Sequence, residues 1–113
     1  MGETLFTQGA MIRLHKHDLP DDVAFGASVA IDTETMGLDQ RRDRLCLVQL
    51  SAGDGTAHCV QIIPPSLGGR GGDCPNLKRL LEDPAVLKIF HFARIDLAAL
   101  HQALGVTVAP VVC

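Results

Sequence analysis

The sequence lacks an excess of positive charge, a long apolar run and a paired-cysteine motif, and each absence removes a class of protein. Ten Lys and Arg residues against thirteen Asp and Glu residues give a net charge of −3, which excludes a generally basic, histone-like nucleic-acid binder. No apolar run approaches the roughly 20 residues needed to cross a bilayer, so we predict no transmembrane segment and no membrane partner. The N-terminus has neither the basic start nor the apolar run of a secretory signal, and the default compartment is therefore the cytoplasm.

The four cysteines form no recognisable metal or disulfide pattern. There is no CxxC motif, and no cysteine has a histidine at zinc-finger spacing. We therefore expect reduced thiols with ordinary structural roles. The chain of 113 residues is 47% hydrophobic, which is enough to form one small domain with a buried core.

Apolar runs and turn signals predict an α/β fold with a mixed sheet. We expect strands over residues 27–32, 45–51, 56–63 and 86–92, a further strand within 106–113, and helices over 76–82 and 93–104. The glycine-containing turn at residues 52–55 predicts that an antiparallel meander opens the fold, and the pattern α-β-α-β follows it. Asn76 is the expected cap of the first helix.

Three segments are expected to lie outside this regular structure. Residues 1–11 are predicted to be an N-terminal extension, and residues 15–22 to be a polar, turn-rich segment. The glycine-rich loop at 68–72 is predicted to be a flexible surface connector, since it lacks the Gly-Lys-Ser/Thr ending of a phosphate-binding loop. The final residues, 111–113, are apolar and uncapped. This favours an incomplete domain over a last strand docked in the sheet.

Two carboxylates stand where an apolar strand is expected to end. Asp32 and Glu34 follow the run ASVAI in the order DTET, and the alternation of an extended chain points both side chains to one side. Two like charges so close together repel each other unless a cation lies between them. A solvated strand end explains the pair equally well at this point.

A third acid, Asp96, is expected on the apolar stripe of the second helix. Ala99, Leu100 and Ala103 share its helical face, so its carboxylate is directed towards the sheet. A carboxylate buried in that position is costly unless it is paired or binds a metal. Because Asp96 lies in the first turn, stabilisation by the helix N-terminus is the competing explanation.

Together the three acids permit metal-assisted cleavage of a phosphodiester. An all-oxygen set of ligands favours Mg²⁺ or Mn²⁺ over zinc. Two such ions would activate a water molecule and stabilise the leaving oxygen. Removing these three from the thirteen acids leaves ten, equal to the ten basic residues, so the proposed ligands account for the net charge.

These residues resemble the motifs of the ribonuclease D family of 3′-5′ exonucleases, within the DEDDy type of the DEDD superfamily and its ribonuclease H-like fold. The run DTETMGL at 32–38 resembles the first exonuclease motif, residues 45–51 resemble the strand after it, and HFARID at 91–96 resembles the second motif. The resemblance implies that Asp32, Glu34 and Asp96 are catalytic and hold two divalent ions, Mg²⁺ or Mn²⁺, with no small-molecule cofactor. It further implies substrate contacts from Thr33, Met36, Gly37, Leu38 and His91.

The resemblance also implies a partner and a reaction. Water would attack the terminal phosphodiester at the 3′ end of RNA, rather than DNA, and release a nucleoside 5′-monophosphate during RNA processing. The third motif of the family carries a Tyr and a fourth metal-binding Asp, whereas this sequence contains no Tyr. We therefore expect residues 12–113 to be the N-terminal part of an exonuclease domain, and the isolated chain to be weakly active or inactive.

Two alternatives remain. An aspartyl phosphotransferase also places an acid after an apolar strand, but it requires a second Asp where this chain has Glu34. A non-catalytic nucleic-acid-binding or interaction fragment would need no complete site. Arg41, Arg42 and Arg44 are available for phosphate contacts, although the aspartates interleaved with them are typical of a solvated turn.

Overall fold

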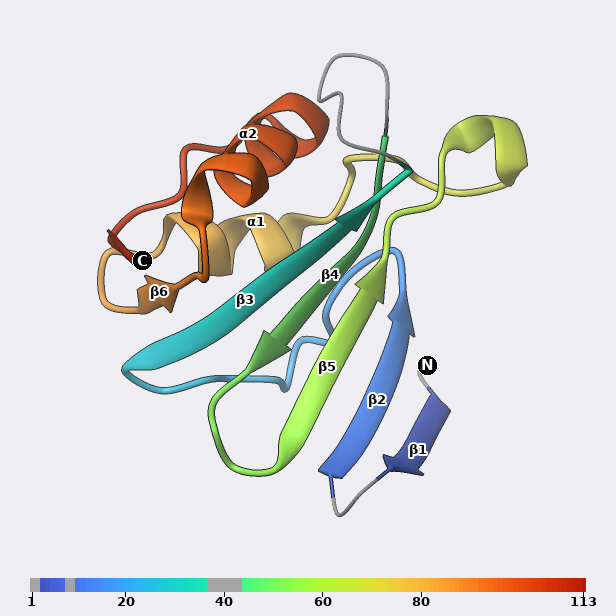
Figure 1. Ribbon diagram of the computed structural model, residues 1–113. Helices are drawn as coiled ribbons and strands as arrows, with labels where there is room; N and C mark the ends of the chain where they lie inside the picture. The colour runs from blue at the N-terminus through green and yellow to red at the C-terminus, as the bar shows by residue number, and fades with distance from the viewer. Residues whose placement is uncertain (1–2, 8–9, 37–43) are drawn as a thin grey trace.

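The computed structural model describes residues 3–7, 10–36 and 44–113, with side chains from residue 11 onward. It shows a seven-stranded mixed sheet in the order β1-β2-β5-β4-β3-β6-β7, with two α-helices on one side of it (Figure 1). The elements are β1 (Glu3–Thr7), β2 (Ala10–Lys16), β3 (Ser28–Thr35), β4 (Leu45–Ser51), β5 (Thr56–Gln61), a 3-10 turn (Pro65–Leu67), α1 (Pro75–Glu82), β6 (Leu87–Ile89), α2 (Ala93–Leu104) and β7 (Val111–Val112). None of the helices in these residues is long and apolar enough to span a membrane.

The predicted antiparallel meander and mixed sheet are confirmed. β3 pairs antiparallel with β4, and β4 pairs antiparallel with β5 across the turn at 52–55. On its other side β3 pairs in parallel with β6, which pairs in parallel with β7. The helix α2 joins these last two strands, as a parallel connection requires.

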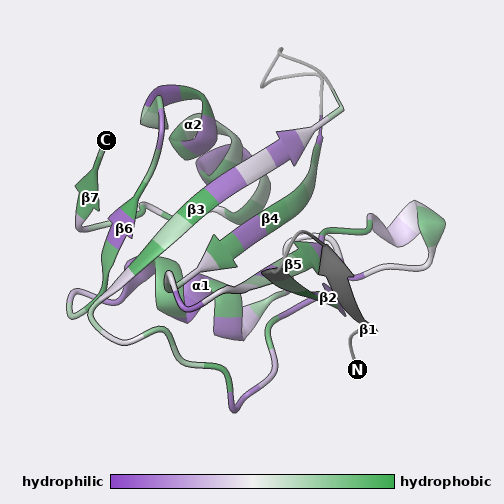
Figure 2. Cartoon of the chain, turned by 60° about the horizontal axis from the view of Figure 1, so that its bottom comes forward, coloured by the Kyte–Doolittle hydropathy of each residue, from purple (hydrophilic) through white to green (hydrophobic). Residues whose placement is uncertain are grey.

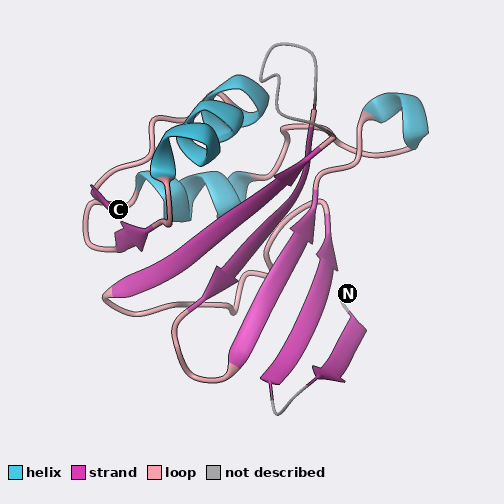
Figure 3. Cartoon of the chain, viewed as in Figure 1, coloured by secondary structure: helices cyan, strands magenta, loops and turns pink. Residues whose placement is uncertain are grey.

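One face of the sheet packs against the helices and forms the core. Val29 and Ile31 of β3 are buried on this face together with Leu50 of β4, while Leu77 of α1 and Leu100 of α2 cover them. Both helices, drawn in cyan in Figure 3, lie on the same side of the strands. In Figure 2, β3 changes from hydrophobic at its start to hydrophilic towards its end. The strand thus leaves the core as it approaches the predicted acids.

β3 is longer than the sequence indicates. It was expected to end at Asp32, but it continues to Thr35, with Asp32 opposite Gln49 and Glu34 opposite Leu47 of β4. A register shift between Glu34 and Thr35 marks its irregular end. The backbone of β4 satisfies the hydrogen bonds of β3 whatever side chains it carries, so a change to polar residues does not end the strand. Both acids therefore lie within the sheet.

The N-terminal region is also more ordered than predicted. Inside the expected extension, β1 forms an antiparallel hairpin with β2, and β2 pairs in parallel with β5. β2 runs through His15, which the sequence placed in a polar turn. Its side chain is buried, with Nε2 3.0 Å from Nδ1 of His58, and the two rings stack with centroids 5.2 Å apart.

The start of α1 is capped by a residue distant in sequence. The predicted cap, Asn76, lies inside the helix, and its side-chain amide donates hydrogen bonds to the Leu19 carbonyl and to Asp21. The carboxylate of Asp18 instead accepts hydrogen bonds from the backbone N–H groups of Asn76 and Leu77, at 2.9 and 2.8 Å. Two of the otherwise free donors at the helix start are satisfied in this way.

The glycine-rich loop is closely packed rather than a loose connector. A Cβ added at Gly69 would lie 1.9 Å from the Ile63 carbonyl oxygen, and one added at Gly72 would lie 2.7 Å from that of Ala103. The N–H of Gly71 donates a hydrogen bond to the same Ile63 oxygen. The glycines allow backbone to approach backbone, which explains their number without a bound phosphate.

The apolar C-terminal stretch forms strand only at its last residues. Val106 and Val108 are buried in the core as irregular chain, and β7 pairs in parallel with β6 at the edge of the sheet. Lys88 of β6 is fully buried beneath this junction. Its ammonium donates hydrogen bonds to the carbonyls of Asp83 and Ala109, at 2.5 and 2.8 Å.

Candidate active site at the end of the central strand

Asp32 and Glu34 lie on the open face of β3, as their spacing predicts. Burial alternates along the strand, with Val29 and Ile31 facing the helices and Asp32 and Glu34 exposed on the opposite side. Thr33, between the two acids, has the orientation of the core residues and is only partly exposed. The strand therefore presents two carboxylates on one side and a hydroxyl on the other.

The third acid, Asp96, is buried on α2 and faces inward, as predicted. It is 7% exposed and lies in the first turn of the helix, which follows β6, the parallel neighbour of β3. The hydroxyl of Thr33 donates a hydrogen bond to Oδ1 of Asp96. This contact ties the acid-bearing end of β3 to the first turn of α2.

The surroundings of Asp96 favour its protonated form. Burial raises the pKa of its carboxyl, and the negative charges of Asp32 and Glu34 raise that pKa further, whereas hydrogen bonds from Thr33 lower it. Among the residues that the structure describes, the groups that perturb this pKa include no cation. Three carboxylates in electrostatic contact repel one another, and a bound cation would relieve this repulsion.

The donor set fits a hard divalent cation. All three candidate ligands are carboxylates, the donors that Mg²⁺ and Mn²⁺ prefer. Asp32 and Glu34 are exposed, and Thr33 engages Oδ1 of Asp96. Within the part of the chain that the structure describes, no three His, Cys, Asp or Glu side chains already enclose an ion. The acids are thus neighbours whose carboxylates would still have to turn towards a common ion.

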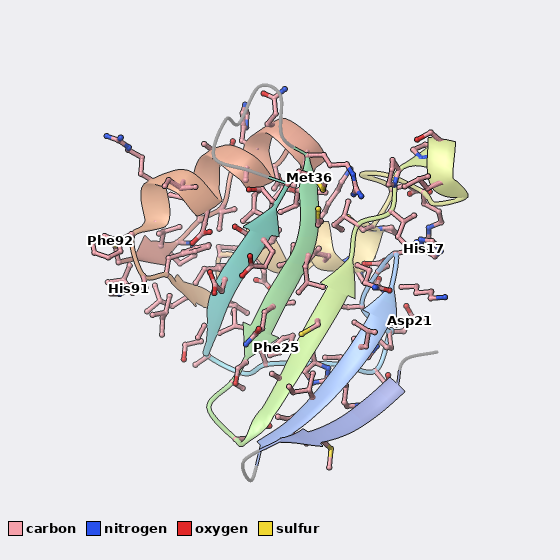
Figure 4. The ribbon with its side chains drawn as sticks, turned by 45° about the vertical axis from the view of Figure 1, so that its right-hand side comes forward. His17, Asp21, Phe25, Met36, His91 and Phe92 are labelled. Carbon is pink, nitrogen blue, oxygen red and sulfur yellow. The ribbon has the colours of Figure 1, made fainter. Side chains whose placement is uncertain are left out.

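The residues predicted to contact the substrate lie in different surroundings. Met36 is 66% exposed just beyond β3, and His91 is exposed before α2 (Figure 4). The hydroxyl of Thr33 is directed to Asp96. Of the arginines, Arg44 donates a hydrogen bond to the Ile62 carbonyl. Four predicted contacts lie outside the described residues: Gly37, Leu38, Arg41 and Arg42.

Sequence reasoning did not single out Phe92. Its side chain is 75% exposed, and its backbone has φ 57° and ψ 62°, in the left-handed region. Its ring lies edge-on to that of His91, with centroids 4.3 Å apart, at the start of the helix that carries Asp96. The sequence predicted a strand over residues 86–92, whereas β6 ends at Ile89, and no sequence signal indicated that Phe92 lies in an exposed turn.

A family model and solved structures match this chain, whereas no curated protein sequence does. Brucella melitensis NrnC, in structures bound to pGG and with bound Mg²⁺, is 51% identical and superposes with a TM-score of 0.81 in both cases. The matches cover 90% of this chain but 48% and 49% of the NrnC chains, so this chain spans about half their length. Escherichia coli RNase D matches at 24% identity and a TM-score of 0.57, over 77% of this chain and 21% of RNase D.

These comparisons confirm the predicted ribonuclease H-like exonuclease fold and the general family. At 24% identity, the match to RNase D establishes a shared fold, and the narrower RNase D assignment stays a prediction. The family model described as 3′-5′ exonuclease matches residues 11–113, which include Asp32, Glu34 and Asp96. The chain therefore belongs to the 3′-5′ exonuclease family.

Proposed function

We propose that this chain supplies three acidic residues of a metal-dependent 3′-5′ exonuclease that hydrolyses the terminal phosphodiester of RNA to a nucleoside 5′-monophosphate. The observation that carries the proposal is the electrostatic interaction of Asp32 and Glu34 on β3 with Asp96 on α2, which Thr33 joins to the strand by a hydrogen bond. Membership of the exonuclease family supports it. The NrnC structures with pGG and with Mg²⁺ support an RNA substrate and a magnesium cofactor.

In this proposal the exposed carboxylates of Asp32 and Glu34 hold two Mg²⁺ or Mn²⁺ ions, and Asp96 contributes from the helix. When bound, such ions lower the pKa of a water molecule and offset the charge that develops on the phosphate. Thr33 keeps one oxygen of Asp96 engaged and so restricts the orientation of this carboxylate. The buried position of Asp96 limits the access of water to one side of the site.

Substrate contacts would come from the residues around these acids. Met36 is exposed just after the end of β3 that carries Asp32 and Glu34. His91 is exposed just before α2, the helix that carries Asp96. We propose that both side chains touch a nucleotide whose phosphate lies at the acids. Since the chain spans about half the length of the NrnC chains, we propose that it is weakly active or inactive on its own.

The first test compares Asp32→Asn with Glu82→Gln, a matched change at an exposed acid at the end of α1. Titration with Mn²⁺, followed by electron paramagnetic resonance, measures the acid site even where turnover is slow. We expect Asp32→Asn to weaken Mn²⁺ binding at least tenfold, because even the loss of a residue that only orients a metal ligand typically costs about 10- to 100-fold in affinity. Glu82→Gln should leave Mn²⁺ binding unchanged. Equal binding by both variants would contradict the proposed metal site.

The second test measures release of nucleoside 5′-monophosphate from a single-stranded RNA with Mg²⁺ and with EDTA. Release that requires Mg²⁺ and is lost in Asp32→Asn supports the enzyme. RNA binding without release, unaffected by Asp32→Asn and by EDTA, would instead support the non-catalytic alternative. Covalent phosphorylation of Asp32 would support the phosphotransferase alternative.

A further inference from the structure

Phe92 displays an aromatic ring to solvent at the start of the helix that carries Asp96. The chain contains four phenylalanines and neither Trp nor Tyr. Among those whose side chains the structure describes, Phe25 and Phe90 are buried at 8% and 3% exposure, whereas Phe92 is 75% exposed. Burial of its ring therefore contributes almost nothing to the stability of this chain.

The backbone of Phe92 is unfavourable for a bulky residue. Its φ of 57° places it in the left-handed region, which costs a side chain of this kind about 1–2 kcal/mol and which glycine adopts freely. The turn lets the chain bury Phe90 and Ala93 on either side, so that His91 and Phe92 are directed outward. A glycine would make the same turn without an exposed ring, so folding alone does not explain a phenylalanine here.

The backbone of Phe92 lies one helical turn from Asp96 in the sequence. Phe92 is the residue before the first turn of α2, and Asp96 lies four residues later, one helical turn along. The ring planes of Phe92 and His91 meet at 63°, so the edge of one ring faces the other and a face of Phe92 remains open. In Figure 4 the two side chains project together from the start of α2.

We propose that the ring of Phe92, steadied by His91, stacks on a nucleobase of the single-stranded substrate whose phosphate is held at Asp32, Glu34 and Asp96. This inference rests on the proposed function, since it concerns the same substrate. Every nucleobase offers a π-face, so an aromatic ring beside a phosphate site binds nucleotides with little dependence on sequence. Among the described residues, Ile89 at the end of β6 and Ile95 in the first turn of α2 are also partly exposed, at 39% and 44%, and the ring of Phe92 is the most exposed of the three.

The absence of Trp and Tyr gives a direct experiment. A Phe92→Trp variant carries a single tryptophan, and a guanine stacked on it should quench its fluorescence. Leu67→Trp, in the 3-10 turn and 69% exposed, is the matched control. GMP and ribose 5-phosphate, which share the phosphate and sugar but differ in the base, are titrated into each variant with Mg²⁺ present.

We expect GMP to quench Phe92→Trp saturably, ribose 5-phosphate to leave its fluorescence unchanged, and Leu67→Trp to respond to neither. In equilibrium binding of a short single-stranded RNA, Phe92→Gly should bind about five- to a hundredfold more weakly than the unmodified chain, and Phe92→Tyr should bind within about twofold of it. Glycine accepts the left-handed backbone, so Phe92→Gly tests the ring without adding strain.

The outcomes separate this inference from the proposed function. Absent quenching together with unchanged RNA binding by Phe92→Gly overturns the stacking contact, even where Mg²⁺-dependent release persists. Quenching by GMP in a protein that releases no mononucleotide would leave the contact standing and count against the enzyme. A change of oligomeric state in Phe92→Gly, measured by sedimentation and without a change in RNA binding, would assign the ring to a protein interface and overturn the proposal.

Discussion

Thr33 donates a hydrogen bond from its hydroxyl to Oδ1 of Asp96, and this contact joins β3 to α2 at the acidic site. The two residues are 63 positions apart in sequence. Asp96 is buried, so an unpartnered carboxylate there would be costly, and Thr33 both satisfies and orients it. We propose that Thr33 acts as a positioning residue for Asp96 in the proposed site.

Thr33→Val should weaken metal binding while the fold is retained. Valine matches threonine in shape but cannot donate, so Asp96 would lose its orienting partner. Loss of such a partner typically reduces metal affinity by about 10- to 100-fold. Thr33→Ser, which keeps the hydroxyl, should restore most of the affinity. Mn²⁺ titration of both variants checks this, and equal affinity in Thr33→Val and the unmodified chain would show that Thr33 does not position Asp96.

The cap of α1 gives a prediction about stability. Asp18 accepts hydrogen bonds from Asn76 and Leu77, so Asp18→Ala should destabilise the chain by about 1–2 kcal/mol. Asp22→Ala, at an exposed acid of the same connecting segment, should change the stability by less than about 0.5 kcal/mol. Urea unfolding of both variants measures the difference. A similar small effect in both would mean that the cap contributes little.

The same cap shows what the sequence could and could not predict. Both helices were predicted almost to the residue, because apolar periodicity and the flanking proline and glycine are local signals. The choice of Asp18 over Asn76 as the cap depends on how the segment before β3 packs against α1. Such a tertiary contact leaves no trace in the local pattern.

In the candidate site, too, some features were predictable from the sequence and others were not. The shared side of Asp32 and Glu34 and the inward direction of Asp96 follow from the periods of a strand and a helix, and both were predicted. The partnership of Thr33 with Asp96 requires knowing that β3 and β6 are neighbours. The outward direction of Phe92 depends on one left-handed residue, which propensities do not predict for phenylalanine.

The glycine-rich loop should tolerate substitution unevenly. Gly69→Ala would place a Cβ 1.9 Å from a backbone oxygen that has no freedom to move aside, and we expect a loss of about 3 kcal/mol. Gly53 in the β4–β5 turn has φ +82° with open space around it, so Gly53→Ala should lose only about 1 kcal/mol, from backbone strain. Comparable losses in thermal unfolding would mean that the loop can relax away from Ile63.

The buried pair His15 and His58 predicts a decrease in stability at acidic pH. The hydrogen bond between the rings needs one donor and one acceptor nitrogen, so at least one ring must be neutral. Burial lowers the pKa of both imidazoles; His58 and Arg13 lower that of His15 further, and Arg13 lowers that of His58. The folded state thus favours neutral rings.

The sign follows from the unfolded chain, in which both histidines take up protons near pH 6.5. Stability is fully present above that pH and should fall as the pH drops below it, towards the lowered pKa values of the folded state. The expected loss is about 1.4 kcal/mol per pH unit for each histidine that is neutral when folded and protonated when unfolded. Urea unfolding between pH 7.5 and 5.5 measures the slope. Replacing both histidines by leucine should flatten it, whereas an unchanged slope would place the acid sensitivity elsewhere.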